Sequence, residues 1–81
     1  MTLAKKYVGT AENSLRKADR EYAYYMSGAQ GDPQQHYLIS QQEYSKARDL
    51  AHEALEIMKE KNYDNLDLMD RINAILEKCD R

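Results

Sequence analysis

Small and apolar side chains recur along the first third of the chain at alternating spacings of four and three residues. This series, the first seam, consists of Ala4, Val8, Ala11, Leu15, Ala18, Tyr22, Tyr25 and Ala29. Such spacing places all of its members on one face of an α-helix, and an unbroken heptad pattern is typical of a helix that packs along another helix. The pattern therefore predicts a helix over about residues 3–28.

A second seam of the same kind predicts a helix over about residues 33–61. It consists of Tyr37, Ser40, Tyr44, Ala47, Ala51, Ala54 and Met58. Each seam has alanines in one half and tyrosines in the other. If the two helices are antiparallel, the tyrosine halves meet at one end of the hairpin and the alanine halves at the other.

The segment between the two seams has the residues of a tight connection. Asp32 is a good N-cap and Pro33 suits the first helical position. Gly28 or Gly31 can adopt the left-handed conformation that ends the preceding helix. A connection this short makes the two helices antiparallel neighbours.

A third, shorter helix is predicted over about residues 65–79, with Asp64 or Asn65 as its N-cap. Its apolar residues are Leu68, Met69, Ile72, Ile75, Leu76 and Cys79. No segment alternates with the period of a strand. The sequence thus predicts a single all-α domain over residues 1–81, a three-helix bundle with a long hairpin and a shorter third helix.

The second predicted helix has a wide apolar face, which requires more than one neighbour. Ile39, Leu50 and Ile57 form a row beside its seam, and Leu55 lies on the other flank. The third helix is about half as long as the hairpin arms. We expect it to cover the half from Leu50 to Met58 and to leave the tyrosine end less covered.

Composition narrows the class of protein. The chain has 12 basic and 14 acidic residues and a net charge of −2, so it has no overall field for nucleic acid or acidic lipid. One cysteine forms no internal disulfide. No apolar segment follows Lys5 and Lys6 as in a signal peptide, and none has the length of about 20 residues that spans a membrane. We expect a cytoplasmic protein without a membrane partner.

Few residues are candidates for catalysis or metal binding. Asp49, His52 and Glu53 resemble the acid and histidine pairs of di-metal bundles, but such a site needs carboxylates from several helices. His36 is predicted to be solvated near the loop. The serines lack a suitably spaced base, and no glycine-rich phosphate loop is present. We therefore expect no catalytic residue, no metal site, no cofactor and no enzymatic activity.

Tyrosine is the dominant aromatic residue, with seven copies and no Phe or Trp. Tyr24 lies off the first seam, one turn after Arg20, where it can stack on the guanidinium. We predict a protein-interaction surface for another helical protein or for a second copy, with the contact residues Tyr22, Tyr24, Tyr25, Tyr37, Ile39 and Tyr44. The alternative is a nucleic-acid-binding face over Arg16–Tyr25, against which the lack of a basic excess counts.

Two segments resemble known families. The pattern Tyr44-x2-Ala47-x3-Ala51-x2-Ala54-Leu55, followed by Asn62-Tyr63, resembles the second helix of a tetratricopeptide repeat, although the preceding helix lacks that repeat's signature. The junction Gly-Asp-Pro-Gln-Gln-His-Tyr at 31–37, followed by Gln41 and Gln42, is similar to helical-hairpin co-chaperones of type III secretion needle subunits. That resemblance covers residues 28–55 and implies a tetratricopeptide-like partner. It leaves the third helix unexplained.

Overall fold

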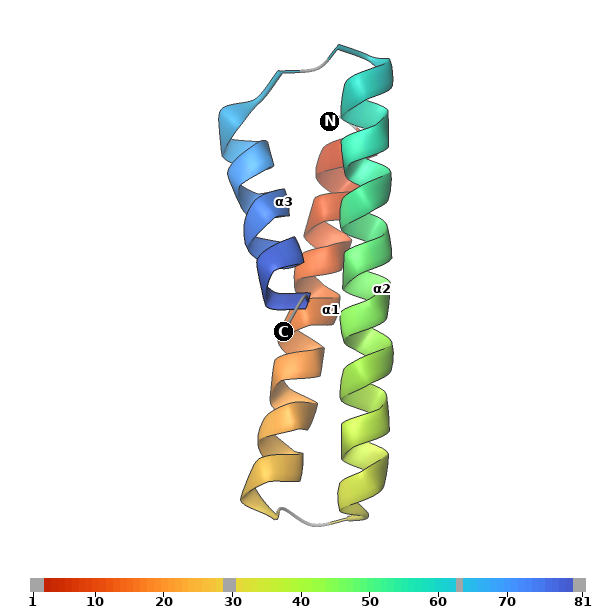
Figure 1. Ribbon diagram of the computed structural model, residues 1–81, viewed down its shortest axis with the longest axis vertical. Helices are drawn as coiled ribbons and strands as arrows, with labels where there is room; N and C mark the ends of the chain where they lie inside the picture. Colours follow the sequence, from red (N-terminus) through yellow and green to blue (C-terminus); the bar gives the residue numbers. More distant parts are fainter. Residues whose placement is uncertain (1–2, 29–30, 63, 80–81) are drawn as a thin grey trace.

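The protein is an elongated bundle of three α-helices. The computed structural model describes residues 3–28, 31–62 and 64–79. The helices are α1 (Leu3–Ser27), α2 (Pro33–Glu60) and α3 (Leu66–Cys79), and the described residues contain no strand. The bundle measures 46 × 19 × 16 Å. Figure 1 shows α1 and α2 as an antiparallel hairpin, with α3 along one half of it. The predicted all-α fold is confirmed, and each predicted helix boundary lies within one residue of the observed one.

The connection between α1 and α2 depends on two glycines and one aspartate. Gly28 and Gly31 have φ angles of 70° and 104°, a region that side chains with a β-carbon rarely adopt. Asp32 is the N-cap of α2, and its carboxylate accepts a hydrogen bond of 3.0 Å from the backbone N–H of Gln34. Ala29, the last position of the first seam, lies outside the described residues.

The second connection ends α2 with a left-handed residue and begins α3 with a side-chain cap. Asn62 has a φ of 50°, and its N–H donates to the carbonyl of Lys59. Asn65, rather than Asp64, caps α3, since its side-chain oxygen accepts a hydrogen bond of 3.1 Å from the N–H of Leu68. Tyr63, part of the tetratricopeptide-like pattern, lies outside the described residues.

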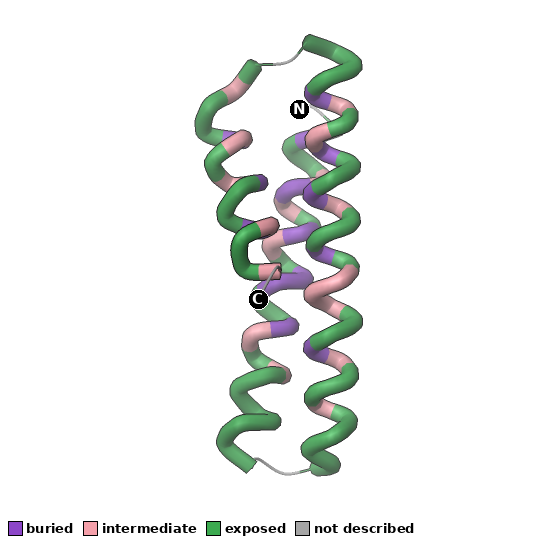
Figure 2. Tube along the Cα trace, viewed as in Figure 1, coloured by how far each residue is buried: buried purple, intermediate pink, exposed green. Residues whose placement is uncertain are grey.

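The core lies in the alanine half of the hairpin, where α3 joins α1 and α2. Because alanine side chains are short, α1 and α2 can approach closely there, and the longer side chains of α3 fill the groove beside them. Figure 2 shows buried positions concentrated in this half. The buried cluster consists of Ala4, Val8, Ala11, Leu15, Ala47, Ala51, Ala54, Met58, Leu68, Ile72 and Ile75.

The third helix packs on one flank of α2 only. Leu55 and Met58 of α2 line a pocket together with Met69 of α3. At 100° per residue, Ile57 points about 200° away from Leu55. The row that includes Leu50 and Ile57 therefore lies on the flank away from α3, where it is half-buried. Thus α3 covers the alanine half, as expected, but from the Leu55 side.

A bidentate ion pair attaches α3 to α1. The Nε and Nη2 atoms of Arg71 donate to the two carboxylate oxygens of Glu12, at 3.0 and 2.5 Å. The hydrogen bond from Arg71, together with its charge and that of Arg16, lowers the pKa of Glu12 below its usual value, although partial burial opposes the change. The same pairing raises the pKa of Arg71. Paired donors of this geometry fix orientation as well as adding energy.

Replacing Ala51 by leucine tests the close packing of the alanine half. Ala51 is fully buried, so the larger side chain must displace its neighbours, and we expect a loss of about 1–3 kcal/mol in the free energy of unfolding. Thermal unfolding followed by circular dichroism measures this loss. The control is Ala74→Leu, at an exposed position of α3, which should change stability by less than about 0.5 kcal/mol. An unchanged melting temperature for Ala51→Leu would contradict the close packing of the two seams at this position.

Replacing Glu12 by glutamine tests the attachment of α3. Because the folded pKa of Glu12 is lowered, its ionisation stabilises the fold above the unfolded pKa of about 4.5, and this stabilisation is lost as pH falls through the folded value. Both partners are partly exposed, so the expected loss at neutral pH is about 1 kcal/mol.

Urea unfolding of wild type and Glu12→Gln at neutral pH and near pH 3 measures the difference. It should be largest at neutral pH and shrink in acid. Glu56→Gln, at an exposed position of α2, should show a much smaller difference at both pH values. A Glu12→Gln difference that is the same at both pH values would contradict the role of the ion pair.

Candidate functional site

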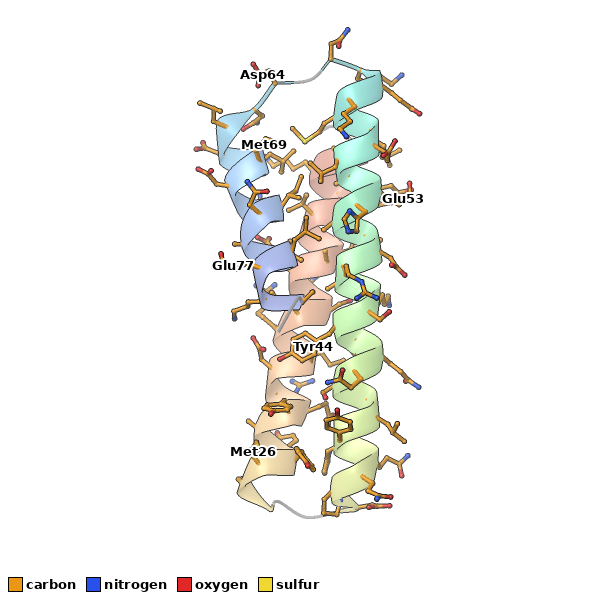
Figure 3. The ribbon with its side chains drawn as sticks, viewed as in Figure 1. Met26, Tyr44, Glu53, Asp64, Met69 and Glu77 are labelled. Carbon is orange, nitrogen blue, oxygen red and sulfur yellow. The ribbon has the colours of Figure 1, made fainter. Side chains whose placement is uncertain are left out.

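The hairpin end that α3 leaves uncovered differs in composition from the rest of the chain. Of the 12 basic and 14 acidic residues, only Asp32 falls between residues 22 and 42. We call this segment the tyrosine end. Surfaces depleted in charge and rich in Tyr and Met are typical of protein interfaces. Figure 3 shows Tyr44 just beyond the end of α3 and Met26 near the tip of the hairpin.

A hydrogen-bonded junction joins the three helices where α3 ends. Asp19 of α1 accepts hydrogen bonds from the Tyr44 hydroxyl at 2.5 Å and from the Lys78 ammonium at 3.0 Å. The Cys79 thiol donates to the backbone carbonyl of Tyr44 at 3.3 Å. Asp19 and Lys78 are both more than 40% exposed, so their ion pair by itself adds little stability. The junction lies at the level of the hairpin where α3 ends.

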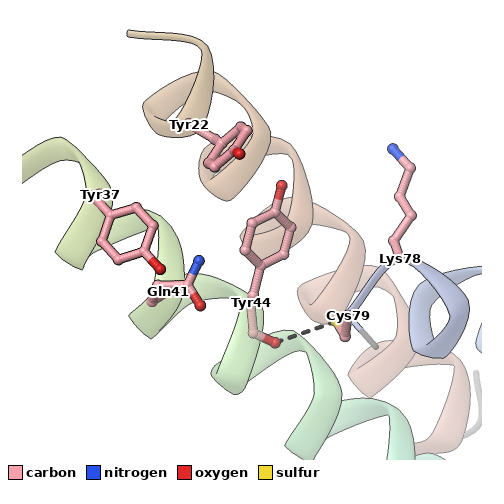
Figure 4. A pocket seen from close by; sticks show the side chains of 6 residues that line it. All are labelled: Tyr22, Tyr37, Gln41, Tyr44, Lys78 and Cys79. Carbon is pink, nitrogen blue, oxygen red and sulfur yellow. Dashed lines mark hydrogen bonds between the residues drawn. The ribbon is translucent and has the colours of Figure 1, made fainter. Parts of the chain in front are cut away.

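Immediately beyond this junction lies a pocket of about 320 Å³ between α1, α2 and the end of α3. Figure 4 shows its walls, in which Tyr22 faces Tyr44 across the hairpin groove and Lys78 and Cys79 come from α3. Its lining residues are Tyr22, Tyr37, Gln41, Tyr44, Lys78 and Cys79. Its walls combine tyrosine rings with the polar groups of Gln41 and Lys78, so the pocket offers a partner side chain both apolar contact and hydrogen bonds.

Three tyrosine rings form a continuous row across the tyrosine end. The ring centroids of Tyr22 and Tyr25 lie 5.9 Å apart, and those of Tyr25 and Tyr37 lie 5.1 Å apart. These rings are 36–41% exposed, so the seam positions continue to the tip but are not enclosed. Tilted aromatic contacts of this length hold each ring in place. The row therefore presents an apolar surface that loses little conformational entropy when a partner binds.

A separate cluster lies on the other side of the hairpin, around His36. The prediction that His36 is solvated is wrong, because its side chain is only 19% exposed. Its Nδ1 atom lies 2.5 Å from Oε2 of Glu21, and its ring contacts the ring of Tyr24 edge-on. The ring contact of Tyr24 is thus with His36, a residue of the other helix. The carboxylate of Glu21, one turn before Tyr25, provides the partner that draws His36 onto α1.

The six predicted contact residues thus fall on two sides of the hairpin. Tyr22, Tyr37 and Tyr44 line the pocket, and Tyr25 joins their row. Tyr24 is 200° from Tyr22 along α1, and Ile39 is 200° from Tyr37 along α2, so both lie away from the pocket. Ile39 is half-buried there.

Sequence reasoning missed three residues on the pocket side: Met26, Gln41 and Lys78. Met26 follows Tyr22 by one turn and is 67% exposed. Gln41 and Lys78 line the pocket. The absence of charge from residues 22–42 is the sequence signal that could have drawn attention to Met26 and Gln41, whereas nothing in the sequence places Lys78 beside the tyrosines.

The predicted nucleic-acid face lies on α1, and the candidate metal residues lie on α2. On the Arg16–Tyr25 face, Arg16 donates to the side chain of Asn13, and Lys17 lies 3.4 Å from Glu43. Asp49, His52 and Glu53 are exposed on α2. Within the described residues, no group of three or more His, Cys, Asp or Glu side chains is arranged to hold a metal ion.

None of the helices, over the residues that the structure describes, is both long and apolar enough to span a membrane.

Comparison with known proteins assigns this chain to no family. No protein-family model matches the chain, and neither a curated protein nor a solved structure matches it. The resemblances to a tetratricopeptide helix and to needle co-chaperones therefore stay predictions.

Proposed function

We propose that this protein is a non-enzymatic interaction module, an adaptor or small chaperone, that binds a helical partner through its tyrosine end. The observation that carries the proposal is that the tyrosine end lacks both a covering third helix and charge. The last residue of α3, Cys79, lies beside Tyr44 of α2, and beyond that level the hairpin exposes tyrosines. Only one charged residue falls between positions 22 and 42. A surface that only faced water would normally carry more charge.

The arrangement of the tyrosine end supports a helix as the ligand. The row of Tyr22, Tyr25 and Tyr37 spans two antiparallel helices beside the pocket, and a surface formed by two such helices accepts the apolar face of a further helix. In the alanine half, α3 packs against the same two helices in this way. The partner helix would therefore continue, past the end of α3, the packing that α3 provides. We place the protein in the cytoplasm, because a single cysteine is more typical of a reducing compartment than of a secreted protein.

Site-specific photocrosslinking tests this proposal. Benzoylphenylalanine in place of Tyr25, an exposed residue of the row, should give a discrete protein adduct in a lysate of the source cells. The same group in place of His52, at an exposed position of α2 in the alanine half, should not. The adduct should weaken when Tyr37 is also changed to lysine, because a charge would then enter the apolar contact. Equal labelling from both positions, or no adduct from either, would contradict the proposal.

A further inference from the structure

We infer that the partner of the tyrosine end is a second copy of this chain, bound antiparallel about a two-fold axis; this inference rests on the proposed function. A two-fold axis brings the same surface of both copies together, so charged groups near the axis would face their own sign. Residues 22–42 contain only one Lys, Arg, Asp or Glu, and their polar groups are mainly Gln amides and Tyr hydroxyls. These groups both donate and accept hydrogen bonds, so they can pair with their own copies.

The position of α3 selects the antiparallel orientation. In a parallel face-to-face pair, both copies would bring α3 into the interface at the same level, and the two third helices would collide. In the antiparallel pair, each α3 lies beyond the tip of the other hairpin. From Tyr44 back to Pro33, α2 extends about 16 Å beyond the end of α3, at about 1.5 Å per residue. Both copies thus offer uncovered stretches of equal length, which together form a short four-helix bundle.

The ends of these stretches have complementary charge. Antiparallel pairing places the tip of one hairpin, with Asp32, near the end of the other copy's α3, with Lys78. Lys78 is about half exposed beside Asp19, so its ammonium remains accessible to a further carboxylate.

Met26 and the pocket also complement each other. Met26 lies one turn beyond Tyr22 and two turns beyond Asp19, so it shares their side of α1. The middle of the uncovered part of α1 lies near Tyr22, and rotation about this point brings Met26 of each copy toward the pocket of the other. The pocket volume of about 320 Å³ admits a flexible thioether side chain. A contact about 16 Å long is at the small end of specific interfaces, so the dimer should be reversible.

Charge substitution at Tyr22 tests the dimer, with sedimentation equilibrium as the measurement. Tyr22 is 38% exposed, so its replacement should leave the fold intact, which circular dichroism checks. Two copies of Tyr22→Lys, or of Tyr22→Glu, place like charges near the axis and should raise the dissociation constant at least about tenfold. An equimolar mixture of the two variants should restore dimers. His52→Lys, the matched control in the alanine half, should dimerise like the wild type.

A second variant tests the packing independently of charge. Met26→Ala shortens the side chain assigned to the other copy's pocket and should weaken dimerisation several-fold without lowering the melting temperature of the monomer. Wild type that stays monomeric at about 1 mM would overturn the inference. Dimers that Tyr22→Lys leaves intact, or variants whose mixture stays monomeric, would also overturn it. A Tyr25 photoadduct with a different protein, in a chain that does not self-associate, would overturn the dimer and still support the proposed function.

Discussion

The structure depends on the close packing of alanines between α1 and α2. Ala11, Ala47 and Ala51 are fully buried and provide little volume of their own. Two helices in contact through such small side chains leave a groove on their flank, and a hairpin alone buries too little apolar surface to be stable at this chain length. The isoleucines of α3, Ile72 and Ile75, fill that groove and supply the largest buried side chains of the core. The three helices therefore form one cooperative unit in this half.

The length of α3 then decides what the rest of the hairpin can do. With 14 residues against 25 and 28 for the arms, it ends at the junction of Asp19, Tyr44 and Lys78. Beyond that point the seam residues change from alanine to tyrosine. Tyrosine fills more of the space between two helices and tolerates water at its hydroxyl, so this half remains ordered without a third helix. The same property makes it suitable for reversible contact with another helical surface.

The two sides of the tyrosine end have different characters. The pocket side combines the ring row with Gln41 and, at the end of α3, Lys78, whereas the other side joins Tyr24 to the paired side chains of His36 and Glu21. The ion pair of Lys17 with Glu43 lies farther along the hairpin. Over the tyrosine row, a partner on the pocket side meets, among the described residues, no charged side chain except near Lys78 and Asp19 at the end of α3, and this lowers the cost of desolvation on association.

The sequence by itself determined the three helices, their boundaries to within one residue, the antiparallel hairpin and the half that α3 covers. Local rules suffice for these features, since Asp32, Pro33 and Gly28 act through backbone geometry and the seams act through helical period. The interior of the alanine half also followed, because each seam position there is enclosed.

Only the tertiary structure decided which flank of α2 receives α3, and hence which residues surround the pocket. The sequence offers two apolar flanks on α2: Leu55 on one side, and the row of Ile39, Leu50 and Ile57 on the other. The helical period does not show which of them packs against α3. The ion pair of Glu12 with Arg71 joins residues far apart in the chain and accompanies the choice of the Leu55 side. The pairing of His36 with Glu21 likewise requires two helices in register, which no single-helix pattern contains.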